Sequence, residues 1–107
     1  MANDSMLVHH VVFSLRDKSP KGKQAFIAAL RELLREQSTA VYSAAGELAD
    51  DIAWSVSDRD FDVAVLIVFP DKATHDAYQD SPPHLRFMDR HEADWTSLRA
   101  IDWYVKK

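Results

Sequence analysis

The chain has 107 residues, a net charge of −4 and no cysteine. Its length suits one domain, and 47% hydrophobic with 28% charged residues is the composition of a folded globular protein rather than a disordered one. The negative charge and the scattered Lys and Arg argue against a nucleic-acid surface, and the lack of cysteine excludes disulfides, thiolate nucleophiles and cysteine-ligated metals.

The N-terminus is a short polar leader over residues 1–5. It lacks the basic and then apolar order of a signal peptide, and no apolar run in the chain approaches the roughly 18 residues that cross a bilayer. We therefore expect a cytoplasmic protein with one domain over residues 1–107 and no membrane contact.

Residues 6–15 are rich in β-branched and aromatic side chains and predict the first strand. Both of its faces carry apolar residues, and His10 and Ser14 interrupt one of them. Ser19 can cap a helix with Pro20 at its first position, and we expect that helix over residues 20–36. Its apolar stripe contains Phe26, Ile27, Leu30, Leu33 and Leu34.

The next segment is ambiguous, because a strand-like opening lies within an alanine-rich stretch. We predict a strand over residues 39–46, with Gly46 at its end or at a bulge. Residues 47–60 then form an acidic loop with an apolar clamp at Ile52 and Trp54. The competing assignment places this strand at 52–57.

Residues 61–69 predict the third strand, which is apolar on both faces. The few helices of the chain can cover only one face of a four-stranded sheet, so the other face needs a different cover. We expect that cover to be a second copy of the chain, packed sheet to sheet in a homodimer.

After Pro70, Asp71 or Thr74 can cap a short helix over 72–79. Ser81 can cap the next helix, which the apolar spacing extends to about residue 99, and the alternation over residues 100–105 predicts a closing strand. The order is βαββαβ, which indicates an α+β protein with a four-stranded antiparallel sheet.

Tyr78 and His84 are the main candidates for chemistry. A helix N-terminus favours a neutral imidazole, which suits a base, and a phenol across the proline corner can hydrogen-bond to a carbonyl or enolate oxygen. His10 is a third polar candidate on an apolar strand. The alternative is that the pair only caps and packs the corner and that His10 is a satisfied core histidine.

The spacing of metal ligands along the chain favours no site. His84 and His91 share a helix face, but seven residues separate them, and the neighbouring Glu92 and Asp94 suit a solvated surface. We therefore expect no bound metal and no organic cofactor.

The chain resembles the stress-responsive A/B barrel (Dabb) family. The resemblance rests on four segments: His10-Val-Val-Phe, Ser43-x-x-Gly46, Phe61-Asp-Val-Ala-Val and Ala77-Tyr-x-x-Ser-Pro-Pro-His84. It spans nearly the whole chain and implies a ferredoxin-like subunit whose sheet packs on that of a second subunit to close a dimeric α/β barrel.

The resemblance also implies a pocket for a small apolar or aromatic ligand that bears a carbonyl group. A plant polyketide cyclase of this family uses residues matching His84 and Tyr78 for an aldol-type ring closure, and has a histidine where this chain has Val63. A cofactor-free monooxygenase reaction and a non-catalytic structural stress protein are the alternatives. The expected ligand-binding residues are His10, Val12, Val63, Val65, Tyr78, His84 and Met88, with His84 as base and Tyr78 as hydrogen-bond donor.

Overall fold

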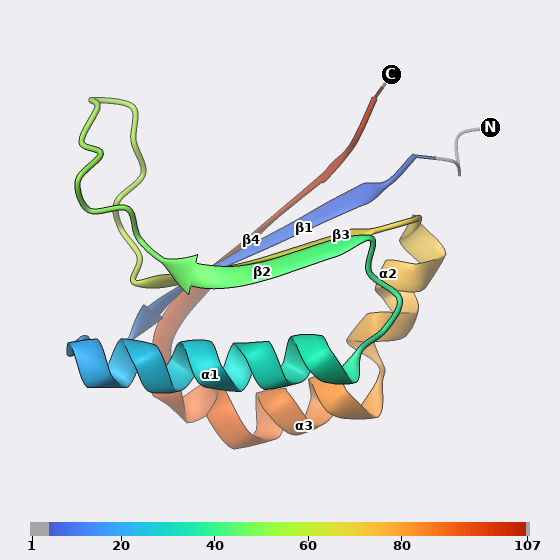
Figure 1. Ribbon diagram of the computed structural model, residues 1–107, viewed down its shortest axis with the longest axis horizontal. Coiled ribbons are helices and arrows are strands. Elements are labelled where there is room, and N and C mark those ends of the chain that lie inside the picture. The colour runs from blue at the N-terminus through green and yellow to red at the C-terminus, as the bar shows by residue number, and fades with distance from the viewer. Residues whose placement is uncertain (1–4, 107) are drawn as a thin grey trace.

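The computed structural model describes residues 5–106, so most of the expected polar leader lies outside the described residues. Its four strands form one antiparallel sheet in the order β2-β3-β1-β4 (Figure 1). This confirms the α+β class and the βαββαβ order, with the second helical region broken in two. The elements are β1 (Leu7–Leu15), α1 (Pro20–Glu36), β2 (Tyr42–Glu47), β3 (Val63–Phe69), α2 (Lys72–Gln79), α3 (Pro82–His91) and β4 (Trp95–Tyr104).

Each helix begins where the sequence indicates. Ser19, Asp71 and Ser81 have extended backbones, and each side chain accepts a hydrogen bond from the backbone N–H three residues further on. These bonds satisfy amide donors that the first helical turn leaves without partners. Local side-chain chemistry therefore fixes where α1, α2 and α3 start.

All three helices lie on one side of the sheet (Figure 1). Alternation along β1 and β3 sends every second side chain toward them, and this helix-covered face forms the core. The opposite, open face carries the intervening side chains. The buried core residues are Leu7, Val11, Phe13, Leu15, Phe26, Leu30, Leu33, Val63, Val65, Ile67, Phe69, Tyr78 and Phe87.

The second strand is β2, and the alternative at 52–57 is wrong. β2 pairs with β3 from Tyr42, opposite Val68, to Glu47, opposite Val63. Gly46 lies inside this regular pairing and has no positive φ, so there is no bulge at Gly46, and the strand ends one residue later than expected, at Glu47. Pairing with β3 decides the position of the strand, because the alanine-rich sequence alone suits either structure.

The loop between β2 and β3 lacks the expected apolar clamp. Ile52 is 50% exposed and Trp54 is 75% exposed, so neither anchors the loop to the rest of the chain. Arg59 instead holds the loop by donating to the carbonyls of Ile52 and Asp50. The apolar side chains of the loop therefore remain on the surface of the subunit.

The expected helix to about residue 99 is wrong, because α3 ends at His91. A 3₁₀ turn follows at Glu92–Asp94, and β4 begins at Trp95. The physical reason is that β1 needs a hydrogen-bonding partner along its second edge, which β4 supplies over its whole length. Arg16 stabilises this 3₁₀ turn with two hydrogen bonds: its backbone N–H donates to the Asp94 carbonyl, and its Nε–H donates to the Ala93 carbonyl.

The open face of the sheet keeps large apolar side chains in contact with solvent. Tyr42, Ile101 and Trp103 are 58%, 53% and 48% exposed. The loop between β2 and β3 projects away from the helices (Figure 1). Among the described helices, none has the length and apolar character to span a membrane.

Asp62 ties the end of β1 to the start of β3, and its substitution should destabilise the fold in a pH-dependent way. Its carboxylate accepts from the Leu15 N–H at 2.8 Å and from Lys18 Nζ at 2.7 Å. Burial raises the pKa of Asp62, but these hydrogen bonds outweigh it and hold the pKa below 3.8. The ionised form therefore stabilises the fold at neutral pH, and this contribution is lost as the pH falls through the folded-state pKa.

We expect Asp62→Asn to lower the free energy of unfolding at pH 7 by about 1.5 to 3 kcal/mol, the range for hydrogen bonds to a charged group. The difference from the parent protein should shrink as the pH falls below 4. Urea denaturation at several pH values measures it, with the loop variant Asp51→Asn as a control. A difference that stays constant down to pH 2 would contradict this account of Asp62.

Candidate functional site

A cavity of about 290 Å³ lies between the helix-covered face and the three helices. This volume is at the small end of the range for ligand-binding pockets. Its apolar walls come from β1, β3 and β4 on one side and from α1 and α3 on the other. They consist of Val11, Phe13, Leu30, Leu33, Val65, Ile67, Phe87, Met88, Leu98 and Ala100.

The polar groups of the cavity come from four elements. His9 lies on β1 and Asp102 lies opposite it on β4; α2 and the first turn of α3 supply the others. The ring centroids of Tyr78 and His84 are 4.8 Å apart, and those of His9 and Tyr78 are 6.5 Å apart. The polar lining residues are His9, His75, Tyr78, Gln79, His84 and Asp102.

His84 is held with its Nε2 atom unprotonated. Its Nδ1 lies 3.0 Å from the carbonyl oxygen of Gln79, which can only accept, so Nδ1 carries the proton. In an uninterrupted helix this carbonyl would accept from residue 83, but Pro83 has no N–H to donate. The proline corner therefore frees the acceptor that sets the tautomer of His84.

The electrostatics of the site keep His84 neutral. Burial lowers the pKa of His84 below 6.5 and outweighs the hydrogen bond to the Gln79 carbonyl, which raises it. Weaker effects of nearby charges follow: His9 and His75 lower the pKa, and Asp80 raises it. The N-terminus of α3 adds to this preference, since its dipole disfavours a positive charge. At neutral pH His84 thus has an available lone pair.

Tyr78 is suited to donate a hydrogen bond. Its side chain packs on Phe69, with ring centroids 5.2 Å apart, and only 6% of the residue is exposed. Burial raises the pKa of the phenol far above neutrality, so it keeps its proton. Within the described part of the chain no residue hydrogen-bonds to this hydroxyl, which leaves it free for a ligand.

The structure adds His9 and Asp102, which the sequence pattern did not indicate. His9 Nδ1 lies 2.5 Å from Asp102 Oδ1, and His9 is 7% exposed. A histidine paired with a carboxylate is a common way to orient an imidazole. One signal was present in the sequence: His9 alternates with Val11 and Phe13, the face that an amphipathic helix would cover.

The placement of His10 and Val12 in one cavity with Tyr78 and His84 is wrong. Both residues lie on the open face, where His10 pairs in register with Leu66 and its ring lies 6.4 Å from that of Trp103. Side chains alternate along a strand, and the helices cover the face of His9. The strand histidine that lies in the cavity with Tyr78 is therefore His9, the neighbour of the expected His10.

The other expected ligand-binding residues divide between cavity and core. Val65 and Met88 line the cavity together with Tyr78 and His84. Val63 lies on the same face but is fully buried and does not line the cavity. Val63 is therefore part of the hydrophobic core behind the cavity wall and is not in contact with the cavity.

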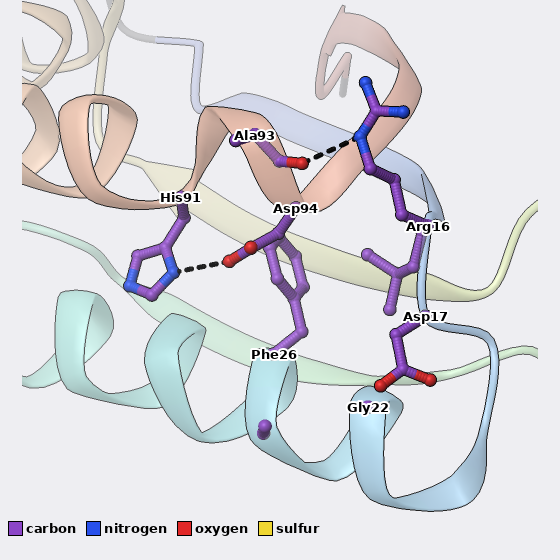
Figure 2. A pocket seen from close by; sticks show the side chains of 9 residues that line it. Arg16, Asp17, Gly22, Phe26, His91, Ala93 and Asp94 are labelled. Atoms are coloured by element: carbon purple, nitrogen blue, oxygen red, sulfur yellow. Dashed lines mark hydrogen bonds and ion pairs between the residues drawn. The ribbon is translucent and has the colours of Figure 1, made fainter.

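A second cavity, of about 260 Å³, lies at the other end of α1 (Figure 2). Figure 2 shows its polar groups paired with each other: His91 Nδ1 lies 2.9 Å from Asp94 Oδ2, and Arg16 donates to the Ala93 carbonyl. Asp17 packs so close to Gly22 that a Cβ at Gly22 would lie 2.5 Å from its carbonyl oxygen. These contacts hold the turn between β1 and α1 and the turn between α3 and β4, so we assign this cavity a structural role.

His84 and His91 thus line different cavities and are not brought together. Among the described residues, one group has ligand atoms close enough to share a metal ion. It consists of His9, His75 and Asp102, with these atoms within 4.8 Å of one another.

Comparison with known proteins identifies the architecture. The family model described as Stress responsive A/B Barrel Domain matches residues 7–105. No curated protein matches the chain. Among solved structures, a Dabb family protein with a ferredoxin-like fold from Mesorhizobium loti is 22% identical, with a TM-score of 0.79 over 96% of this chain and 99% of that one.

Two further structures are similar. A hydroxynitrile lyase from Passiflora edulis is 20% identical, with a TM-score of 0.76 over 97% of this chain and 96% of that one. A dimeric ferredoxin-like protein of unknown function from Thermobifida fusca is also 20% identical, with a TM-score of 0.75 over 94% of this chain and 92% of that one. At these identities the similarity establishes the ferredoxin-like fold.

The tautomer and pKa of His84 are directly measurable. We expect long-range ¹H–¹⁵N NMR spectra to show the Nδ1-protonated form at pH 7 and a pKa below 6.5 in the folded protein. Pro83→Ala introduces an N–H that competes for the Gln79 carbonyl, so the other tautomer should increase. The urea-unfolded chain is the reference, and a folded-state pKa at or above the unfolded value would refute the assignment.

Proposed function

The chain belongs to the stress responsive A/B barrel domain family, and on that premise we propose that it is an acid–base catalyst acting on a small apolar or aromatic carbonyl compound. One observation carries the proposal: the unprotonated Nε2 of His84 belongs to a ring beside that of Tyr78 in an apolar cavity. A base next to a hydrogen-bond donor is the arrangement that proton transfer at a carbonyl compound requires.

In the proposed reaction, His84 Nε2 removes a proton from the substrate. The negative charge that results collects on the substrate oxygen, where the Tyr78 hydroxyl donates a hydrogen bond. The apolar walls of the cavity strengthen this interaction, because they lower the local dielectric constant. His9, oriented by Asp102, is close enough to Tyr78 to contact the same substrate.

The volume of the cavity limits the substrate to a small molecule. An engineered cavity of about 150 Å³ holds benzene. The cavity of about 290 Å³ therefore suits one aromatic ring with a short substituent.

The hydroxynitrile lyase from Passiflora edulis, which has the same fold, supports this substrate class. Cleavage of a hydroxynitrile begins when a base takes the hydroxyl proton; the bond to the nitrile carbon then breaks, cyanide leaves with the electron pair, and a carbonyl forms. An aldol-type ring closure also begins with removal of a proton by a base. The arrangement of His84 and Tyr78 suits both reactions.

Substitution of the two side chains tests the proposal, with the hydroxynitrile of benzaldehyde as the probe. Release of benzaldehyde is followed by its ultraviolet absorbance. We expect His84→Ala to lower kcat/KM by about 10²- to 10⁴-fold through loss of the base. Tyr78→Phe should lower it by about 10²- to 10³-fold through loss of oxyanion stabilisation.

His91→Ala, in the second cavity, is the matched control and should retain the parent rate. Thermal denaturation of each variant shows whether the fold is intact. If the parent protein neither cleaves the hydroxynitrile nor binds benzaldehyde in NMR titrations, and His84→Ala changes only the Tm, the site is structural and the proposal fails.

We further propose that the chain forms a homodimer through the open face. Tyr42, Ile101 and Trp103 are exposed there, and Trp54, on the loop between β2 and β3, is exposed as well. Apolar side chains of this size on one face are typical of a protein interface. The similar protein from Thermobifida fusca is described as dimeric, which supports the same assembly here.

Ile101→Asp should dissociate the proposed dimer, because it would bury an unpaired carboxylate at the interface. We expect the dissociation constant to rise at least about 100-fold. Sedimentation velocity at micromolar concentration measures it. Leu85→Asp, at a 55% exposed position on α3, is the control and should leave the dimer intact; a parent protein that is a stable monomer would exclude this assembly.

A further inference from the structure

We propose that His9, His75 and Asp102 form a binding site for a divalent first-row transition metal ion. Their ligand atoms all lie within 4.8 Å of one another at the polar end of the cavity. Two imidazoles and a carboxylate are a donor set that zinc and iron(II) accept in proteins. The three residues come from β1, α2 and β4, so spacing along the chain could not indicate them.

The distances are close to those of a metal centre. Metal bonds to histidine and carboxylate are about 2.0 to 2.2 Å, which places two ligand atoms on one ion about 3 Å apart. His9 Nδ1 and Asp102 Oδ1 are 2.5 Å apart, with a proton between them that a cation would replace. The ligand atoms of the cluster lie within 4.8 Å of one another, so a side-chain adjustment of His75 by about 2 Å or less would complete the set.

His75 has the second interaction that metal-binding histidines usually have. Its Nδ1 lies 3.0 Å from the carboxylate of Asp76, which fixes the proton on Nδ1 and leaves the lone pair on Nε2. Nε2 in turn lies 3.3 Å from the side-chain amide of Gln79. A metal ion would take the place of that weak contact. Lys72 holds Asp76 from the other side, with its Nζ 2.5 Å from the carboxylate.

Access and coordination number also fit an open site. His9 is buried, whereas 44% of the Asp102 side chain is exposed, so an ion can enter from solvent. Three protein ligands leave at least one coordination position for water or a ligand in the apolar cavity. The site requires neither Tyr78 nor His84 as a ligand, so metal binding and the proposed base catalysis can fail independently.

The pair of His91 and Asp94 provides an internal comparison. Its atoms are 2.9 Å apart, but within the described residues no third ligand group joins it. Both His91 with Asp94 and His9 with Asp102 are histidine–carboxylate pairs. Among the described residues, only the second pair has a third ligand, His75, and so reaches the three ligands that tight metal binding needs.

Titration of the chelator-treated protein with Zn²⁺ by calorimetry, and with Co²⁺ by visible absorption, tests the site. We expect one ion per chain and the d–d bands of a nitrogen- and oxygen-ligated Co²⁺. His75→Ala and Asp102→Asn should each weaken Zn²⁺ binding at least about 100-fold, since loss of a ligand costs more than loss of a second-sphere contact.

Asp76→Asn keeps all three ligands and should weaken Zn²⁺ binding about 10- to 100-fold. His91→Ala is the matched control and should bind as the parent does, while circular dichroism shows that each variant is folded. Failure of the parent protein to bind either ion at micromolar concentration would overturn the proposal. So would binding that His75→Ala and Asp76→Asn leave unchanged, or that His91→Ala abolishes.

Discussion

The pairing of β1 with β4 along its whole length is the constraint on which the rest of the structure depends. β1 is an inner strand, so the backbone groups of both its edges need hydrogen-bonding partners. β3 satisfies one edge, and β4 can satisfy the other only if it begins at Trp95. That requirement ends α3 at His91, although helical spacing continues, and the same register places Asp102 opposite His9. Backbone hydrogen bonding thus assembles the polar end of the cavity.

The proline corner between α2 and α3 positions the other two polar side chains of the proposed site, Tyr78 and His84. The prolines after Ser81 break the helical region into α2 and α3. The corner between these helices brings Tyr78 and His84 together, with their ring centroids 4.8 Å apart. Because Pro83 has no N–H, the carbonyl of Gln79 is free to hold His84 in one tautomer. The same residues that end one helix and start the next therefore also prepare a base beside a phenol.

The helices cover the sheet on one side only, so its two faces differ, and we propose a different role for each face. His9 and His10 are adjacent in the chain, yet one lies at the cavity and the other on the open face. The helices enclose the space in which we propose acid–base chemistry and metal binding. The uncovered face, with Ile101 and Trp103 exposed, is available for a second subunit. Alternation along a single strand thus gives each proposed function its own surface.

The sequence by itself determined the class of the protein, the starts of the three helices and the positions of β1 and β3, since these depend on caps, prolines and local alternation. It also indicated Tyr78 and His84, because they flank a proline corner. The tertiary structure alone decided the position of β2, the end of α3 and the choice of His9 over His10. Pairing between distant strands, and the side from which the helices pack, overrule local preference at these places. For the same reason the grouping of His9, His75 and Asp102, from three separate elements, becomes visible only in the folded chain.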